Sequence, residues 1–344
     1  MDEILARLPD ALLPWYARCR RDLPWRRDRE PYHVWLSEIM LQQTRVEAVR
    51  GYYGRFLAAL PTIGALAAAA PDELNKLWEG LGYYSRARNL QRAARIVADE
   101  RGGVFPRDYA SVRALPGVGA YTAGAILSIC FGEPTPAVDG NVLRVCARLR
   151  DDPSPVTDAA VRERVERELA AVYPAGRCGD FTQSLMELGA TVCLPNGAPD
   201  CGACPCGAFC LGRARGTARS LPVRAEKKPR RGEALTVFLL RCGDRWAVTR
   251  RPERGLLAGL WAFPETPGLL GPQEALDAAA AWGARPTGLE KSADKTHVFT
   301  HIVWNMRGYY LACAAMPERF RWVTREELES RVALPTAYRQ FWEP

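Results

Sequence analysis

The chain has 344 residues, of which 48% are hydrophobic and 25% charged, so it is long enough for two globular domains of ordinary size. No stretch approaches the roughly twenty apolar residues of a membrane helix, and the acidic N-terminus is unlike a secretory signal, so we expect a cytoplasmic protein without membrane contact. The net charge of +8 is concentrated in residues 211–232, which carry eight basic side chains and one acidic one.

Two regions of different character follow each other along the chain. Residues 1–210 are rich in Ala, Leu and Arg, with apolar residues every three or four positions, which predicts an almost wholly helical domain. The basic stretch 211–232 contains Pro and Gly and is typical of an interdomain linker, although its charge also suits contact with phosphates. Residues 233–344 mix strand-like segments such as LTVFLLRC with two helical ones, which predicts an α+β domain.

Glu38 is the first candidate catalytic residue. It lies in the predicted helix PYHVWLSEIML, three positions after Trp35 and four after Val34, so its side chain projects from an apolar face. Burial there would raise its pKa toward neutrality and prepare the carboxyl group to deliver a proton. For an isolated glutamate, a simple pairing with arginine at a helix crossing is the alternative.

A tight LPGVG turn at residues 115–119 joins two further helical segments. Its glycines, Gly117 and Gly119, allow backbone amides to approach a phosphate at the start of the second helix. Asp139 follows at the start of another helix, where its simplest role is to cap that helix. Cleavage of an N-glycosidic bond needs a proton for the leaving base and a negative group near the sugar cation, and two separated carboxyl groups supply both.

Five cysteines lie within residues 193–210, and thiols packed this closely in a reducing compartment are usually metal ligands. Structural zinc sites commonly use two separate pairs of closely spaced ligands, whereas only one such pair is present here. The spacing therefore favours a 4Fe-4S cluster, with a fifth thiol, Cys206, as a possible substitute ligand. The four favoured ligands, separated by seven, two and five residues, are Cys193, Cys201, Cys204 and Cys210.

Five motifs, in this order, resemble the adenine-specific mismatch DNA glycosylases of bacteria, a family of helix-hairpin-helix iron–sulfur DNA glycosylases. They are WLSEIMLQQT, EGLGYYSRARNL, LPGVGAYTAGAI, VDGNVLRV and the cysteine loop, and the resemblance covers essentially the whole chain. It implies that Glu38 protonates an adenine flipped out of the duplex. It also implies that Asp139 stabilises the oxocarbenium ion or forms a transient covalent adduct, with Tyr121 and Asn141 assisting at the sugar and the attacking water.

The same resemblance implies further contacts with DNA. An adenine pocket would be lined by Trp25, Arg26 and Gln183, and the strand would be contacted by Gln43, Thr44 and Tyr83, of which Gln43 and Tyr83 are candidate wedges for the gap that the flipped base leaves. The first cysteine gap is seven residues here and usually six in these glycosylases, which keeps Cys206 open as a ligand.

Tyr121 stands where the related endonuclease III type glycosylase/lyases carry a catalytic lysine. Residues 1–226 contain a single lysine, Lys76, so an amine nucleophile is essentially lacking. We therefore expect base excision without efficient strand cleavage. The alternatives are a bifunctional glycosylase/lyase for oxidised pyrimidines and a non-catalytic iron–sulfur DNA-binding protein; the presence of both Glu38 and Asp139 argues against the latter.

The C-terminal region resembles a Nudix hydrolase fold. A working Nudix enzyme needs clustered glutamates for divalent metal, but GPQEALDAAAAWGA holds only Glu274 and Asp277, so pyrophosphohydrolase activity is not expected. The resemblance implies instead that this region reads 8-oxoguanine opposite adenine. The candidate contacts are Phe299, Thr300 and His301. The expected partner is double-stranded DNA with adenine opposite 8-oxoguanine or guanine, bound by a monomer.

Overall fold

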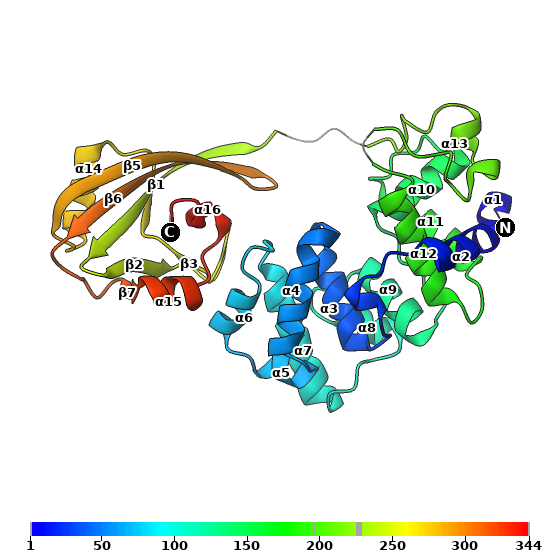
Figure 1. The fold of residues 1–344 in the computed structure, drawn as a ribbon, viewed down its shortest axis with the longest axis horizontal. Helices are drawn as coiled ribbons and strands as arrows, with labels where there is room; N and C mark the ends of the chain where they lie inside the picture. The colour runs from blue at the N-terminus through cyan, green and yellow to red at the C-terminus, as the bar shows by residue number, and fades with distance from the viewer. Residues whose placement is uncertain (1, 196, 225–228, 343–344) are drawn as a thin grey trace. The chain divides into compact units, whose positions relative to one another are not determined.

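The computed structural model describes residues 2–195, 197–224 and 229–342 (Figure 1). The chain forms two compact units. The helical unit comprises Met1–Ala68 and Arg88–Glu226, and the sheet unit comprises Ala69–Ala87 and Lys227–Pro344. None of the helices in the described parts of the chain is both long and apolar enough to cross a bilayer.

Short helices joined by tight turns make up the helical unit. Proline at the first helical position and aspartate side chains that cap the helix start recur among them, as expected for groups that satisfy or remove unpaired amides. The helices are α1 (Glu3–Ala6), α2 (Leu8–Cys19), η1 (Pro24–Arg26), α3 (Pro31–Leu41), α4 (Val46–Ala59), α5 (Ile63–Ala68), α7 (Ser85–Arg101), α8 (Tyr109–Ala114), α9 (Ala120–Phe131), α10 (Gly140–Arg150), α11 (Ala159–Ala170), α12 (Cys178–Thr191), η2 (Gly207–Phe209) and α13 (Leu211–Ala214).

The core that positions the site lies between α2, α10 and α12, with α12 packed directly on both α2 and α10. α9 packs on both α3 and α12. Close approach is possible because two helical positions are glycine: Gly124 of α9 faces the segment before α10, and Gly189 of α12 faces α10. A Cβ on Gly124 would lie 2.1 Å from the carbonyl oxygen of Pro136, and one on Gly189 would lie 2.7 Å from Cβ of Asn141. These contacts bring α3, α9, α10 and α12 around one region of the unit.

The predicted helix-hairpin-helix is formed by α8 and α9. Asp108 caps α8 through a hydrogen bond to the amide of Ser111, and Gly119 is the residue that precedes the first turn of α9. Gly117 has φ +79°, and a Cβ there would lie 2.8 Å from Cβ of Asn89. The turn therefore requires glycine at this position for both its backbone conformation and its space.

The sheet unit contains a mixed sheet with the strand order β3-β2-β1-β6-β5. β1 and β6 are parallel, and the other pairs are antiparallel, with β4 on β1 and β7 on β2. The elements are α6 (Pro71–Leu77), β1 (Arg231–Cys242), β2 (Arg245–Arg250), β3 (Trp261–Ala262), β4 (Glu265–Pro267), α14 (Pro272–Ala281), β5 (Pro286–Val298), β6 (Ile302–Cys313), β7 (Arg321–Thr324), α15 (Arg325–Ser330) and α16 (Thr336–Arg339).

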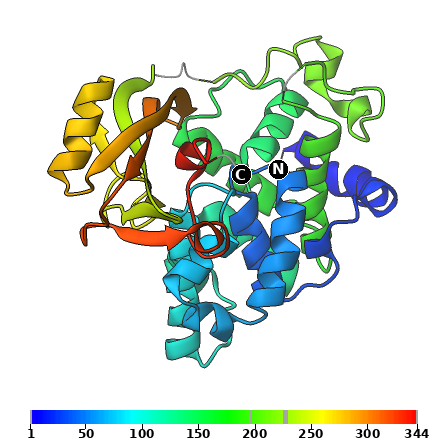
Figure 2. The same ribbon diagram turned by 60° about the vertical axis from the view of Figure 1, so that its left-hand side comes forward.

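Helices cover both faces of this sheet, as the two views in Figures 1 and 2 show. Alternate residues of β1 enter two separate cores: Val237 and Leu239 pack with α15 and α16, and Phe238 and Leu240 pack with α14. β5 is an edge strand, so it is largely exposed. The structure confirms the expected combination of an all-α region and a C-terminal α+β region.

Candidate active site

One pocket of the helical unit gathers residues from η1, α3, α9, α10 and α12, and its volume is about 170 Å³. Eight of the residues predicted from the sequence line this pocket, although they are spread over most of the helical unit. They are Trp25, Arg26, Glu38, Thr44, Tyr121, Asp139, Asn141 and Gln183. The two candidate catalytic carboxyl groups therefore face the same cavity from different helices.

Glu38 enters the pocket from α3 and is 5% exposed. Burial raises the pKa of its carboxyl group, contact with the Tyr121 hydroxyl opposes this, and the negative charge of Asp139 adds to it, so that the pKa is about 7. Its Oε2 atom has no hydrogen-bond partner among the described residues. Glu38 is thus a carboxylic acid that is half protonated near neutral pH, with one oxygen available to a bound molecule.

Asp139 caps α10 and lines the pocket at the same time. Its Oδ1 accepts from the amides of Asn141 and Val142 at 2.9 and 2.8 Å, and its Oδ2 accepts from Nδ2 of Asn141 at 2.7 Å. Burial raises the pKa of Asp139, while these hydrogen bonds oppose the rise. The capping role and a role in chemistry are therefore compatible, because the cap fixes the carboxylate at the pocket edge.

Arg144 links this end of α10 to the cysteine loop. Its guanidinium donates to Oδ1 of Asn141 at 2.9 Å and to the carbonyls of Gly189 and Cys193 at 2.8 and 2.9 Å. Asn141 is held on both sides as a result, by Asp139 and by Arg144. The position of the cysteine loop and the orientation of Asn141 thus depend on the same buried arginine.

Tyr121 projects from α9 into the pocket. Burial, together with the nearby negative charges of Glu38 and Asp139, keeps the pKa of its hydroxyl well above the ordinary value, so it remains neutral. No lysine occurs among the described residues that line the pocket. Lys76 lies on α6 in the sheet unit, where its ammonium pairs with Glu79 at 2.7 Å.

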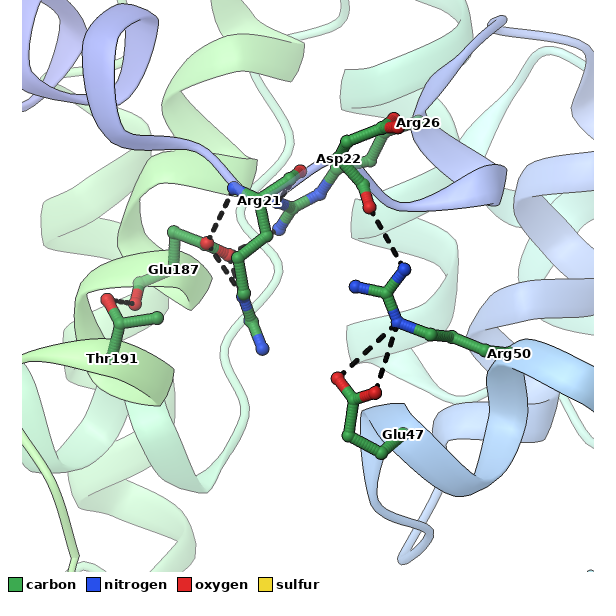
Figure 3. Close-up of polar contacts among 7 residues, drawn as sticks. All are labelled: Arg21, Asp22, Arg26, Glu47, Arg50, Glu187 and Thr191. Carbon is green, nitrogen blue, oxygen red and sulfur yellow. Dashed lines mark hydrogen bonds and ion pairs between the residues drawn. The ribbon is translucent and has the colours of Figure 1, made fainter.

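Two arginines line one side of the pocket and are held from behind by a buried glutamate, an arrangement that the sequence predicted only in part. Arg21 and Arg26 both line the cavity, and Glu187 on α12 accepts hydrogen bonds from both (Figure 3). The sequence predicted Arg26 but not Arg21 or Glu187. One available signal was that Glu187 lies four residues after Gln183, on the same face of α12.

Of the residues predicted to contact the DNA strand, Thr44 lines this pocket, whereas Gln43 and Tyr83 do not. Gln43 and Tyr83, the candidate wedges, have φ angles of +57° and +47°, a left-handed backbone conformation that is uncommon outside glycine. Both side chains are exposed. Such strained, projecting residues tend to occur at functional sites.

Tyr83 belongs to the sheet unit, and there its hydroxyl lies 2.9 Å from Oγ1 of Thr300. Thr300 and His301 are exposed at the tip of the β5–β6 hairpin. Phe299 is half-buried, with its ring 4.9 Å from that of Trp304. The structure therefore brings one predicted wedge together with one predicted lesion-reading residue.

Four cysteines line a second, smaller cavity of the helical unit together with Arg148. They are the four favoured ligands, Cys193, Cys201, Cys204 and Cys210. Cys206 is fully buried in the core beside α10 and α12 and does not line that cavity. Within the described ranges, no three His, Cys, Asp or Glu side chains converge closely enough to form a metal site.

Comparison with known proteins defines the class. The sequence model of the HhH-GPD superfamily base excision DNA repair proteins matches residues 36–171, and that of the NUDIX domain matches residues 236–344. The helical region is similar to a solved thermostable thymine-DNA glycosylase (TM-score 0.56, 27% identity, 62% of this chain and 98% of that one). It is also similar to endonuclease III in a non-covalent DNA complex (TM-score 0.52, 26% identity, 61% and 94%). The fold is that of a helix-hairpin-helix base-excision DNA glycosylase.

Relatives narrow this class. The chain is 37% identical to the adenine DNA glycosylase of Homo sapiens, over 96% of this chain and 72% of that protein. It is 36% identical to that of Rattus norvegicus, over 96% and 76%, and 40% identical to that of Arabidopsis thaliana, over 74% and 46%. The chain belongs to the adenine DNA glycosylase family, and the resemblance found in its motifs is confirmed.

Glu38→Gln should abolish most of the base release, because the amide has no proton to donate; we expect a loss of about a hundredfold or more in the single-turnover rate. In the wild type the protonated form is the acid, so the rate should fall as the pH rises above about 7. Rates measured with enzyme in excess between pH 5 and 9 test this. The exposed Glu47→Gln variant is the control and should behave as wild type.

The same substitution should increase the free energy of unfolding relative to the wild type as the pH rises, although it lowers the rate of base release. A carboxyl whose pKa is raised on folding stabilises the fold fully only below the unfolded pKa, and this contribution is lost as the pH rises through about 7. Relative to the wild type, Glu38→Gln should therefore gain up to about 3 kcal/mol between pH 4.5 and 8. A difference that stays constant over this range would contradict a buried, neutral Glu38.

Proposed function

We propose that this protein hydrolyses the N-glycosidic bond of adenine in double-stranded DNA, where adenine lies opposite 8-oxoguanine or guanine. The observation that carries the proposal is the convergence of Glu38 and Asp139 on one pocket, with the pKa of Glu38 raised to about 7. The names of the relatives support adenine as the base.

The pocket residues divide the reaction between them. An adenine flipped out of the duplex enters the cavity beside Glu38, whose proton moves to a ring nitrogen of the base. The glycosidic bond breaks, and its electron pair leaves with the base. Asp139 stabilises the positive charge that develops on the sugar, either through space or as a transient covalent adduct.

Water completes the reaction. Its oxygen adds to the sugar carbon, and one of its protons passes to a carboxylate of the pocket, which restores the acid for the next cycle. Asn141, held by Asp139 and Arg144, is placed to orient this water. The neutral hydroxyl of Tyr121 lies beside both carboxyl groups and assists at the sugar.

The proposed reaction stops at an abasic site. Strand cleavage by a glycosylase of this type requires an amine that attacks the sugar and forms a Schiff base. Tyr121 stands where that amine would be needed, and Lys76, which pairs with Glu79, does not line the pocket. The protein should therefore release the base and leave the strand intact.

Contact with the DNA strand is proposed for the turn between α8 and α9 and for the two wedges. The backbone at Gly117 and Gly119 precedes the start of α9, where amides and the helix dipole suit a phosphate. Gln43, Thr44 and Tyr83 would fill or line the gap left by the flipped adenine. The exposed, strained backbones of Gln43 and Tyr83 support this role.

The sheet unit is proposed to read the opposite base through Phe299, Thr300 and His301. This role is supported by their place at the tip of the β5–β6 hairpin and by the hydrogen bond between Thr300 and Tyr83. Hydrolysis of nucleotides is not proposed. Of the two acidic residues near α14, Glu274 accepts from the amide of Gly271 at the helix start and Asp277 accepts from Gln273, so both take part in local hydrogen bonds.

A 4Fe-4S cluster is proposed for the cysteine loop. Four thiols around one cavity are a donor set that suits iron, and Cys206 lies in the core outside that cavity. When bound, the cluster would act as a structural staple for the loop that presents basic residues to DNA.

We further propose domain boundaries at 1–210, 211–232 and 233–344, and a monomer that works on DNA in the cytoplasm, at the nucleoid if the cell is bacterial.

Single-turnover excision tests the function. On duplexes with adenine opposite 8-oxoguanine or guanine, we expect release of adenine and strand breaks only after treatment with alkali. Duplexes carrying thymine glycol are the matched control and should remain intact. Strong nicking without alkali, or release of an oxidised pyrimidine instead of adenine, would support the bifunctional lyase; binding without any release would support the non-catalytic protein.

Single cysteine-to-serine variants test the cluster. As isolated, Cys201→Ser should lose iron and the broad visible absorption of a cluster, whereas Cys206→Ser should retain both, since Cys206 does not line the cavity. Iron and sulfide analysis with absorption spectra provides the measurement. The opposite result, with Cys206 required and Cys201 dispensable, would replace the proposed ligand set.

A further inference from the structure

Glu187 on α12 is the most completely paired acidic side chain near the pocket, and it is 0% exposed. Its Oε1 accepts from the backbone amide and Nε of Arg21 at 3.0 and 2.8 Å. Its Oε2 accepts from Nη2 of Arg21 at 3.0 Å and from Nη2 of Arg26 at 2.8 Å (Figure 3). One carboxylate thus joins α12 to the loop that connects α2 with η1.

The charge on Glu187 is secured by these contacts. Burial alone would raise its pKa, but the hydrogen bonds from Arg21 and Arg26 outweigh burial and lower the pKa to about 2. A buried carboxylate with two arginine partners leaves one positive charge in excess. That excess charge lies on guanidinium groups that line the pocket, whereas Glu187 itself does not line it.

Arg26 is the partner whose position matters most for a bound base. Its side chain is 12% exposed, its Nη1 donates to the carbonyl of Arg21 at 3.3 Å, and its guanidinium lies 5.6 Å from the ring centre of Tyr16. A guanidinium has five N–H donors. The hydrogen bonds from Arg26 to the carbonyl of Arg21 and to Glu187 use two of them, which leaves others for a ligand. The free donors belong to a group that the pocket lining includes.

We propose that Glu187 is a positioning residue for base recognition: it holds Arg26 at the pocket wall so that the remaining N–H groups of Arg26 donate to acceptor nitrogens of the bound base. This inference rests on the proposed function. Because Glu187 already holds the Arg26 side chain in place, its N–H groups lose little conformational entropy when a base binds. They can therefore favour the orientation of the base in which the reaction occurs. Arg21 shares the carboxylate and braces the same loop from its backbone and side chain.

The loop has a second anchor that provides a matched control. Arg50 on α4 donates to the carbonyl of Asp22 at 3.2 Å and pairs with Glu47 (Figure 3). Arg50→Gln removes that anchor without touching Glu187, Arg21 or Arg26. If Glu187 merely tethers the loop, the two substitutions should have similar effects; if it positions Arg26, they should differ.

The experiment measures single-turnover adenine release and DNA affinity for the wild type, Glu187→Gln, Arg26→Gln, the double variant and Arg50→Gln. We expect Glu187→Gln to lower the rate about tenfold with little change in affinity, and Arg50→Gln to change neither. The double variant should be no slower than Arg26→Gln alone. Equal losses in Glu187→Gln and Arg50→Gln, or additive losses in the double variant, would overturn the inference.

A crystal structure of Glu187→Gln gives an answer that does not depend on activity. We expect the guanidinium of Arg26 to have left its position beside Tyr16 while α12 and α2 keep theirs. A guanidinium that remains in place overturns the inference, even if adenine is released normally by the wild type. Failure of the wild type to release adenine would instead contradict the proposed function, and the position of Arg26 would still decide the role of Glu187.

Discussion

The removal of the Glu38 carboxyl group from water is the constraint on which the rest of the site depends. A glutamate side chain in water is ionised at neutral pH and has no proton to give, whereas burial on α3 raises its pKa to about 7. Keeping this carboxyl group buried costs folding free energy above pH 4.5, because the unfolded chain can ionise the group in water and the folded chain opposes its ionisation. Tight packing of α9 on α3 and α12 keeps the environment closed.

Three carboxyl groups of the helical unit, the buried Glu38 and Glu187 and the half-buried Asp139, show how partners decide charge. Glu38 has an oxygen without a partner among the described residues, and its pKa rises. Glu187 accepts from two arginines, and its pKa falls to about 2. For Asp139 the two effects compete: burial raises its pKa, while hydrogen bonds from the amides of α10 and from the side chain of Asn141 oppose the rise. One pocket region thereby combines a carboxyl group that can hold a proton near neutral pH, a fixed anion and a carboxylate held at a helix start.

Much of the candidate active site could be predicted from the sequence because its signals are local. The apolar spacing around Glu38, the LPGVG turn and the aspartate before Gly140 each depend on neighbours within a few residues. The pairing of Arg21 with Glu187 behind the pocket lining was not predictable in this way, because the two residues are 166 positions apart and meet only through tertiary packing. The parallel pairing of β1 with β6 and the hydrogen bond between Tyr83 and Thr300 could not be predicted from local sequence patterns either.

A direct titration of Glu38 tests the central claim. Carbon-13 NMR of the protein labelled at glutamate side-chain carboxyl carbons, with Glu38 assigned by its loss in Glu38→Gln, reports the ionisation of this group alone. The account predicts a midpoint at about 7, and a lower midpoint in Asp139→Asn, because the negative charge of Asp139 contributes to the rise. A midpoint near 4.5, the ordinary value for glutamate, would contradict the account.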